Sequence, residues 1–161
     1  FNKSELKFMG HILSKNGIQI DEAKVKAVRA AEPPKSANEV LSFLGLVTFC
    51  AKFIKNYATT AEPLRKLTRG NVPWEWGPEQ QTAFETLKQR LISAEVMAYY
   101  NPSAETHLIV DAGPCGVAAI LNQKQSNGDV RPVAYASRTL TPTQRRYSQT
   151  EREALAVLFG I

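Results

Sequence analysis

The chain has 161 residues, of which 43% are hydrophobic and 22% charged, and its formal net charge at pH 7 is +5. That length allows one domain or two small ones, and the composition is that of a folded globular protein rather than a disordered one. The longest apolar stretches fall well short of the ~20 residues that a membrane span needs, so we expect no membrane contact.

The ends of the chain and its cysteines bear on its context. The chain begins with Phe, and its last residues have the pattern of a helix that is still running, so we expect a piece of a longer polypeptide. Its two cysteines, Cys50 and Cys115, are too few for a disulfide framework and lack CxxC spacing. They favour a reducing compartment, and we therefore expect an intracellular protein.

The positive charge is concentrated in the first half of the chain. Residues 1–76 carry 12 Lys and Arg against 7 Asp and Glu, whereas residues 77–161 carry 8 against 8. Such a basic segment suits contact with a phosphate backbone, although a solvated protein surface is the more frequent explanation.

A hairpin and a short helix are the first predicted elements. Loosely alternating apolar residues from 6 to 20 are interrupted by Asn16 and Gly17, a pair that suits a type I′ turn because both central positions need positive φ. Asp21 can then cap a helix that runs to about Arg29 and ends before the two prolines at positions 33 and 34.

Two further helices are predicted after the prolines. Ser36 and Glu39 have the spacing of a capping box, in which each side chain satisfies a free backbone N–H. The apolar residues that follow recur every three or four positions and predict an amphipathic helix ending near Asn56; they are Val40, Phe43, Leu44, Val47, Ala51 and Ile54. A shorter helix is predicted from Ala61 to just before Gly70.

Basic and aromatic residues on and after these helices are candidates for nucleic-acid contact. Five cations could form a basic rim, although a merely solvated rim is the more frequent explanation; they are Lys52, Lys55, Arg65, Lys66 and Arg69. Trp74 and Trp76 could stack on bases, but we expect them to belong to the core. A helix that starts near Pro78 buries a stripe that includes Phe84 and Leu87.

The last part of the chain predicts strands. Three apolar runs at residues 108–112, 116–121 and 133–137 are joined by short turns, of which residues 126–129 form one, so we expect an antiparallel meander. A terminal helix then opens at Thr141 or at Thr150. Helices followed by strands in this way predict an α+β fold.

Asp111 is the first residue that could carry chemistry. It ends an apolar strand, where a charged group is costly to bury unless it pairs or binds a metal, and the small Ala112 and Gly113 leave room for a ligand. The alternative, that Asp111 only caps the following turn, has equal weight on local grounds.

The second candidate is one of two glutamates on the terminal helix. Glu151 and Glu153 lie about 200° apart at ~100° per residue, so only one can face the sheet, and the spacing leaves open which one. Either carboxylate, together with Asp111, would make an oxygen-ligand site suited to Mg²⁺. The alternative role for a glutamate in a first helical turn is a favourable interaction with the helix dipole.

Several motifs, in one order along the chain, resemble the Pol polyproteins of gypsy-type LTR retrotransposons, from the end of the reverse transcriptase into its RNase H domain. They are FMGHILS (8–14), NGI (16–18), LSFLGL (41–46), FIKNY (53–57), PL (63–64), WEW (74–76), AFETLK (83–88), VDA (110–112), PVAYASRTL (132–140) and YSQTERE (147–153). Each motif is weak alone, but together in this order and spacing they are highly specific.

The resemblance implies three segments. Residues 1–20 would be the end of the palm, with a primer-grip hairpin around Phe8, Met9, Gly10 and His11, and residues 21–72 would be a helical thumb that cradles the template–primer duplex. Residues 73–161 would be a truncated RNase H-like domain, with a three-stranded antiparallel meander and a helix. Without the last strands of that sheet, we expect an exposed edge and marginal stability in residues 101–161.

The resemblance also implies the site and its chemistry. Asp111 matches the first catalytic carboxylate of the family and Glu153 the second, and in the family these hold two Mg²⁺ ions, or Mn²⁺ in their place, that activate water to cut the RNA strand of an RNA–DNA hybrid. The polymerase aspartates would precede residue 1 and the remaining RNase H carboxylates would follow residue 161, so we expect this stretch alone to catalyse neither step. Gly113 stands where the family usually has Ser, which could weaken activity.

The intact parent is expected to be a multifunctional enzyme, an RNA-directed DNA polymerase and an RNA–DNA hybrid ribonuclease. Its partners would be the template–primer duplex, the hybrid and the remainder of Pol, in the cytoplasm or in a virus-like particle. The alternative is a decayed or host-retained copy that at most binds nucleic acid.

Overall fold

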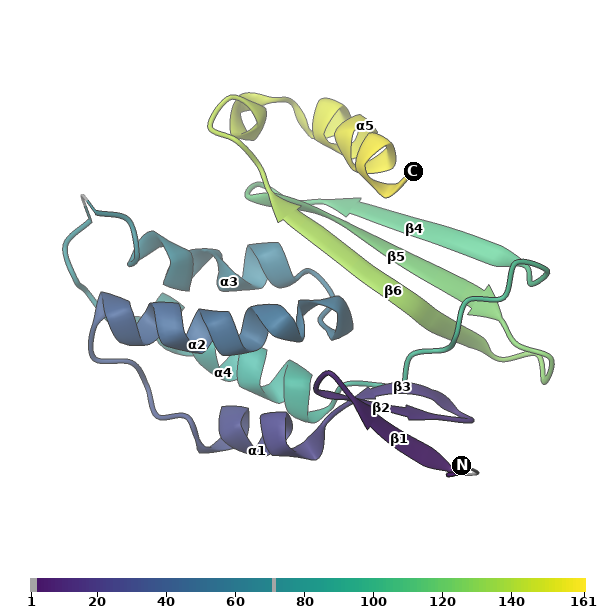
Figure 1. The fold of residues 1–161 in the computed structure, drawn as a ribbon. Coiled ribbons are helices and arrows are strands. Elements are labelled where there is room, and N and C mark those ends of the chain that lie inside the picture. Colours follow the sequence, from purple (N-terminus) through teal and green to yellow (C-terminus); the bar gives the residue numbers. More distant parts are fainter. Residues whose placement is uncertain (1–2, 71) are drawn as a thin grey trace.

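The computed structural model describes residues 3–70 and 72–161; residues 1, 2 and 71, which belong to the predicted palm and thumb segments, lie outside the described residues. The strands are β1 (Glu5–Phe8), β2 (His11–Ser14), β3 (Gly17–Ile20), β4 (Thr106–Ala112), β5 (Gly116–Lys124) and β6 (Val130–Thr139). The helices are α1 (Glu22–Ala30), α2 (Ala37–Phe49), α3 (Tyr57–Lys66), α4 (Pro78–Ile92) and α5 (Gln149–Gly160), with 3₁₀ turns η1 (Ala51–Phe53) and η2 (Gln144–Arg146). Helices α1–α4 gather on one side of the molecule and the strands on the other (Figure 1), which confirms the α+β class.

The first sheet contains two hairpins where the sequence predicted one. Strands β1, β2 and β3 pair antiparallel in that order. The turn with positive φ at both central positions is Met9–Gly10, at 45° and 72°, which is the type I′ signature. The predicted turn at Asn16 and Gly17 is wrong in detail, because only Gly17 has positive φ (129°) and it already pairs with Ser14.

The helix caps follow the sequence in part. Asp21 accepts a hydrogen bond from the backbone N–H of Ala23 at 3.0 Å and caps α1 as predicted. The Ser36 hydroxyl likewise accepts from the N–H of Glu39 at 3.3 Å. The Glu39 carboxylate, however, accepts from the N–H of Lys35 at 2.8 Å rather than from that of Ser36, so only half of the predicted capping box forms.

The long amphipathic helix predicted to reach Asn56 is broken. Helix α2 ends at Phe49, η1 follows, and α3 begins at Tyr57 with Asn56 in the left-handed conformation (φ 54°). The apolar spacing hides this break, because Cys50 and Ile54 continue the buried face of α2 with 1% exposure each. The second helix therefore starts four residues before the predicted Ala61.

The main core lies between the helices. It includes the predicted stripe residues Phe84 and Leu87 of α4, which are fully buried. Trp76 packs edge-on against Phe84 and its indole N–H donates to Gln81 at 2.8 Å, which confirms a core role for this ring, whereas Trp74 stacks on Trp76 and is 40% exposed. Helix α4 thus packs with α1 and α3, across the predicted boundary between thumb and RNase H-like segments.

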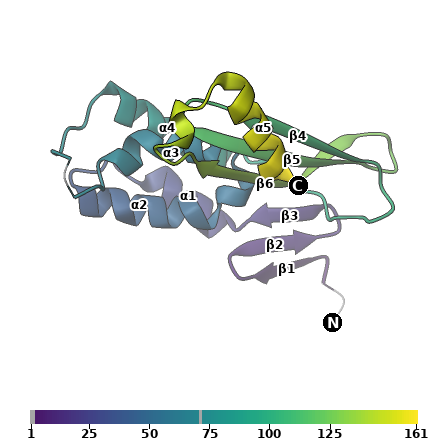
Figure 2. The ribbon, with the colours of Figure 1, turned by 90° about the horizontal axis from the view of Figure 1, so that it is seen from above.

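The second sheet is the predicted meander, with order β4-β5-β6. Helix α5 crosses one face of it (Figure 2), and α3 and η1 contact it from the other side, which explains why most of β5 is buried. A small second core between α5 and the sheet consists of Ala112, Val117, Leu140 and Ala156. Among the described residues the sheet pairs β4 with β5 alone, and Ile109 of β4 is 50% exposed. None of the helices in the described residues is long and apolar enough to cross a membrane.

The cap of α5 is neither of the two predicted threonines. Thr141 instead lies in the turn before η2, where its hydroxyl accepts from the N–H of Gln144 at 3.2 Å. Ser148 caps α5 with a complete capping box: its hydroxyl accepts from the N–H of Glu151 at 3.3 Å, and its own N–H donates to the Glu151 carboxylate at 2.7 Å. The Ser–Glu spacing of a capping box is therefore also present at residues 148–151, where it marks the start of α5.

Ser148→Ala is expected to lower the free energy of unfolding by about 1 kcal/mol, because it leaves the N–H of Glu151 without its acceptor. Urea unfolding followed by circular dichroism measures this. Thr150, two residues further on in the first turn of α5, is exposed. Thr150→Ala therefore serves as the control and should change stability by less than about 0.5 kcal/mol. Equal effects of the two substitutions would show that Ser148 is not the cap.

Candidate active site

Asp111 lies near the end of the edge strand β4 and is exposed. Its neighbours Val110 and Ala112 pack beneath α5, so the alternation of a strand directs Asp111 to the other face of the sheet. The sequence placed this carboxylate on an apolar strand where burial would be costly; the strand is apolar but mostly exposed. Among the described residues Asp111 makes no hydrogen bond to the following turn, which is closed by Gly113 N–H and Gly116 O at 2.9 Å.

The partner of Asp111 comes from the helical part of the chain. The Asn56 side-chain amide, at the start of α3, donates from Nδ2 to Asp111 Oδ2 at 3.2 Å. Fifty-five residues separate the two along the chain. Asn56 was not among the predicted site residues, and no local sequence pattern links it to the strand.

The two glutamates of α5 have different surroundings. Glu151 is engaged in the capping box, and its hydrogen bonds with Ser148 lower the pKa of its carboxyl group. Glu153 Oε1 instead accepts from Gln149 Nε2 at 2.9 Å, and the same amide donates to the backbone oxygen of Ala112 at 3.1 Å. Gln149 thus ties Glu153 to the end of β4. Its position four residues before Glu153 is a spacing that could have been recognised in the sequence.

Asp111 and Glu153 line one cavity of about 420 Å³ between β4 and α5. The other residues that line it are Val110, Ala112, Thr150, Ala154, Ala156 and Val157. Both side chains are hard oxygen donors of the kind that Mg²⁺ prefers, and Asp111 borders the cavity from the edge strand, with its carboxylate hydrogen-bonded to Asn56 on the face opposite α5. In residues 3–70 and 72–161 there is no cluster of three or more His, Cys, Asp or Glu that could hold a metal.

Gly113 stands where the resembled family usually has serine, and the local backbone does not require a glycine there. A Cβ added there would meet only the backbone oxygen of Gly116, at 3.8 Å, which is ordinary contact. A serine would therefore fit at this position next to Asp111.

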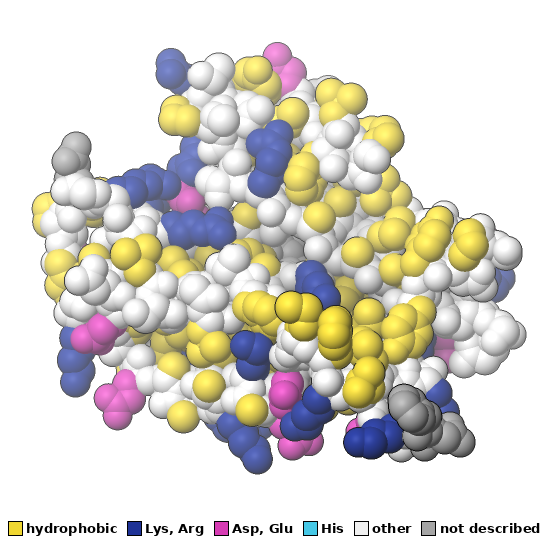
Figure 3. Space-filling view, viewed as in Figure 1, with side chains coloured by type: hydrophobic (Ala, Val, Ile, Leu, Met, Phe, Trp, Pro, Cys, Tyr) yellow, Lys and Arg dark blue, Asp and Glu magenta, His cyan; other side chains and the backbone are white. Residues whose placement is uncertain are grey.

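The predicted primer-grip residues form the β1–β2 turn and its neighbourhood. Phe8 and Met9 are 58% and 74% exposed. His11 is held between the rings of Phe49 and Phe53, with ring centroids 5.1 Å and 5.6 Å away. Figure 3 shows hydrophobic side chains gathered over this hairpin and the end of α2. The turn therefore presents an apolar surface.

The five predicted rim cations do not share one role. Arg69 pairs with Glu62 at 2.8 Å, and Arg65 donates to the Thr139 hydroxyl at 3.1 Å. The other three, which are Lys52, Lys55 and Lys66, are exposed. Arg65 and Arg69 thus bind other side chains of this protein, although Arg69 stays half exposed.

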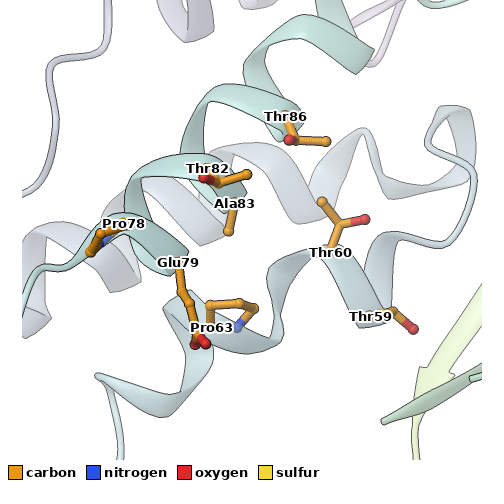
Figure 4. Close-up of a pocket in the computed structure, with 8 residues that line it drawn as sticks. All are labelled: Thr59, Thr60, Pro63, Pro78, Glu79, Thr82, Ala83 and Thr86. Carbon is orange, nitrogen blue, oxygen red and sulfur yellow. The ribbon is translucent and has the colours of Figure 1, made fainter. Parts of the chain in front are cut away.

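A second cavity, of about 440 Å³, lies between α3 and α4 (Figure 4). Threonine and proline side chains dominate its lining, and Glu79 is its one titratable residue. It offers no convergent groups for catalysis.

Comparison with known proteins identifies relatives along the whole chain. The family described as the RNase H-like domain found in reverse transcriptase matches residues 76–161. The chain is 34% identical over 172 residues to a retrovirus-related Pol polyprotein from transposon opus of Drosophila melanogaster, covering 100% of this chain and 17% of that protein. It is 33% identical over 158 residues to the transposon Tf2-3 polyprotein of Schizosaccharomyces pombe, covering 98% of this chain and 12% of that protein. The chain thus spans less than a fifth of the length of these relatives.

Solved structures share the fold. A foamy viral protease–reverse transcriptase in complex with double-stranded DNA matches with a TM-score of 0.79 and 22% identity, over 96% of this chain and 27% of that one. The same kind of protein in complex with an RNA/DNA hybrid matches with a TM-score of 0.78 and 20% identity, over 98% of this chain and 21% of that one. The resemblance to retroelement Pol is confirmed by the family match and by the relatives, and the chain belongs to the family of RNase H-like domains found in reverse transcriptases.

Proposed function

We propose that this chain is part of a retroelement Pol that synthesises DNA on an RNA template and removes the RNA strand of RNA–DNA hybrids by Mg²⁺-dependent hydrolysis. The observation that carries the proposal is that Asp111 and Glu153 both line one cavity of an RNase H-like domain. The relatives support the setting, since they are transposon polyproteins of which this chain covers a small share. An intracellular location, in the cytoplasm or a virus-like particle, is part of the proposal.

In this proposal the two carboxylates hold the metal and the polypeptide around them fixes their positions. When bound, Mg²⁺ ions supply charge to the scissile phosphate and lower the pKa of water. Glu153 is oriented by Gln149, which is itself anchored on the backbone of Ala112. Asp111 stands on a paired strand, whose hydrogen-bonded ladder with β5 fixes its backbone. The two described carboxylates form part of the ligand set, and neighbouring polypeptide would complete it.

The helical part and the first sheet would hold the duplex. The exposed lysines Lys52, Lys55 and Lys66 suit phosphate contacts, which position a duplex without reading its sequence. The exposed turn at Phe8 and Met9 would contact the primer. Duplex binding is expected to weaken as the salt concentration rises. The lysine contacts release counterions condensed on the phosphates, and added salt opposes this release.

The test is Mg²⁺-dependent cleavage of a labelled RNA–DNA hybrid by this chain expressed with the flanking polypeptide of its own reading frame. Asp111→Asn and Glu153→Gln are each expected to abolish cleavage. Glu151→Gln is the matched control on the same helix, because glutamine also serves at this position of a capping box, so cleavage should persist. Cleavage that survives both changes would refute the site, and a wild type without cleavage would favour a remnant that only binds nucleic acid.

A further inference from the structure

We propose that Asn56, at the start of α3, is a positioning residue for Asp111. The inference rests on the proposed function, in which Asp111 is a metal-holding carboxylate, and it adds a residue from outside the RNase H-like segment. Its basis is the hydrogen bond from Asn56 Nδ2 to Asp111 Oδ2 at 3.2 Å. The hydrogen bond joins a neutral donor to a charged acceptor, which is stronger and more directional than a bond between neutral groups.

The backbone of Asn56 is in an uncommon conformation. Its φ of 54° and ψ of 35° are left-handed, and in the described part of the chain only Met9 shares positive φ among residues other than glycine. Asparagine tolerates this region better than most residues, and glycine adopts it freely. This left-handed residue is the N-cap of α3 and turns the chain into that helix, and its side chain reaches β4.

The segment around Asn56 is fixed on several sides. Its backbone oxygen accepts from the N–H and the hydroxyl of Thr60, at 3.1 Å and 3.0 Å. Arg90 of α4 donates to the Thr60 hydroxyl at 2.8 Å and to the backbone oxygen of Lys55. On the opposite side, the N–H of Ala58 donates to the Ser137 hydroxyl of β6 at 2.9 Å. Because the backbone is held by both α4 and the sheet, the amide has little freedom to leave Asp111.

The orientation of the Asn56 side-chain amide is set by the Asp111 carboxylate. Asn56 Oδ1 is buried and has no hydrogen-bond partner within the described residues. Burial of an unpaired acceptor is unfavourable, so the interaction of Nδ2 with Asp111 must outweigh it. The reversed amide would place its oxygen against the negative carboxylate. Asp111 therefore selects the orientation, and the amide in turn occupies Oδ2 and leaves Oδ1 for a cation.

This arrangement makes the first carboxylate of the site dependent on the packing of the helices against the sheet. Carboxylates that bind metals are themselves hydrogen-bonded, and loss of such an outer partner typically costs about 10–100-fold in metal affinity. Asn56 plays for Asp111 the part that Gln149 plays for Glu153, but from a segment that precedes the family match at residue 76.

The test uses Mn²⁺ as a paramagnetic probe of the 161-residue chain by NMR. The measured quantity is the Mn²⁺ concentration that half-broadens the backbone amide signals of residues 111 and 112. Asn56→Gly keeps the left-handed backbone and removes the amide, and it is expected to raise this concentration about tenfold, at the lower end of the usual range because the contact is exposed. Asn56→Ala removes the amide and also strains the backbone, so it should show the same shift together with a lower melting temperature.

The combination of variants separates the possible outcomes. If Asn56 had only a structural role, the Mn²⁺ response would follow the melting temperature, changing in Asn56→Ala and not in Asn56→Gly, and the inference would be wrong. Asp111→Asn is run in parallel and should abolish the broadening. If it does so while both Asn56 variants behave as the wild type, Asn56 is excluded and the proposed site stands. If Asp111→Asn also leaves the broadening unchanged, the proposed site itself is excluded.

Discussion

Arg145→Ala is expected to lower the free energy of unfolding by about 3 kcal/mol, because it leaves a buried carboxylate with too little countercharge. Glu62 of α3 is 2% exposed. Its Oε1 accepts from Arg145 at 2.7 Å and from Arg69 at 2.8 Å, while its Oε2 is buried without a partner among the described residues. Arg69 is half exposed and cannot by itself compensate the buried charge. The pair joins α3 to the segment before α5, so its loss should loosen the contact between helices and sheet.

The same ion pair predicts how this loss depends on pH. Burial alone would raise the pKa of Glu62, but the hydrogen bonds and charges of Arg145 and Arg69 outweigh burial and hold it below its usual value of 4.5. A carboxylate whose pKa is lowered by folding adds stability that is fully present above the unfolded pKa and is lost as pH falls through the folded value. The destabilisation by Arg145→Ala should therefore be full near neutral pH and shrink below pH 4.5.

Urea unfolding at neutral and acidic pH measures this effect, and two further variants define it. Arg146→Ala removes the adjacent, exposed arginine and should change stability by less than about 0.5 kcal/mol. Glu62→Gln in the Arg145→Ala background should recover part of the loss, because the uncompensated charge disappears. Equal losses at positions 145 and 146, or no recovery in the double variant, would contradict a buried ion pair.

The periodicity of apolar residues predicted much of the fold. The stripe of α4 with Phe84 and Leu87 and the three strands of the meander lie where the pattern placed them, since burial of one face is what the pattern encodes. The same pattern missed the end of α2 at Phe49, because Cys50 and Ile54 stay on the buried face although they lie beyond the helix. The periodicity of apolar residues indicates which side chains are buried. It does not reveal the end of a helix when the residues that follow stay buried on the same face.

The candidate site was predictable only in part. Spacing could not choose between Glu151 and Glu153; the family resemblance chose Glu153, and the structure places that residue on the cavity with Asp111. Their catalytic role remains a prediction. Gln149 could have been found from its spacing to Glu153, whereas Asn56 could not, since its contact with Asp111 arises only when the helices pack against the sheet. Contacts between distant segments carry no local signature.

Gly17→Ala is expected to destabilise the protein by about 3 kcal/mol, because two unfavourable terms add at this position. Its φ of 129° lies where side chains are strained. A Cβ would also overlap the backbone oxygen of Met97 and meet the Val96 side chain at 3.2 Å. That oxygen cannot move freely, since it accepts from the N–H of Ile18 at 2.9 Å, and the N–H of Met97 donates back to Ile18 O at 3.0 Å.

Two other glycines separate these terms. Gly128 has φ 89° but open space around its would-be Cβ, so Gly128→Ala should cost only the left-handed conformation, about 1–2 kcal/mol. Gly45 lies inside α2 with open space, and Gly45→Ala should stabilise by about 0.5–1 kcal/mol. The excess cost at Gly17 over Gly128 measures the close approach to Met97, and faster hydrogen exchange of the Ile18 amide should accompany it. If Gly17→Ala costs no more than Gly128→Ala, the first sheet is not held against residue 97 by this contact.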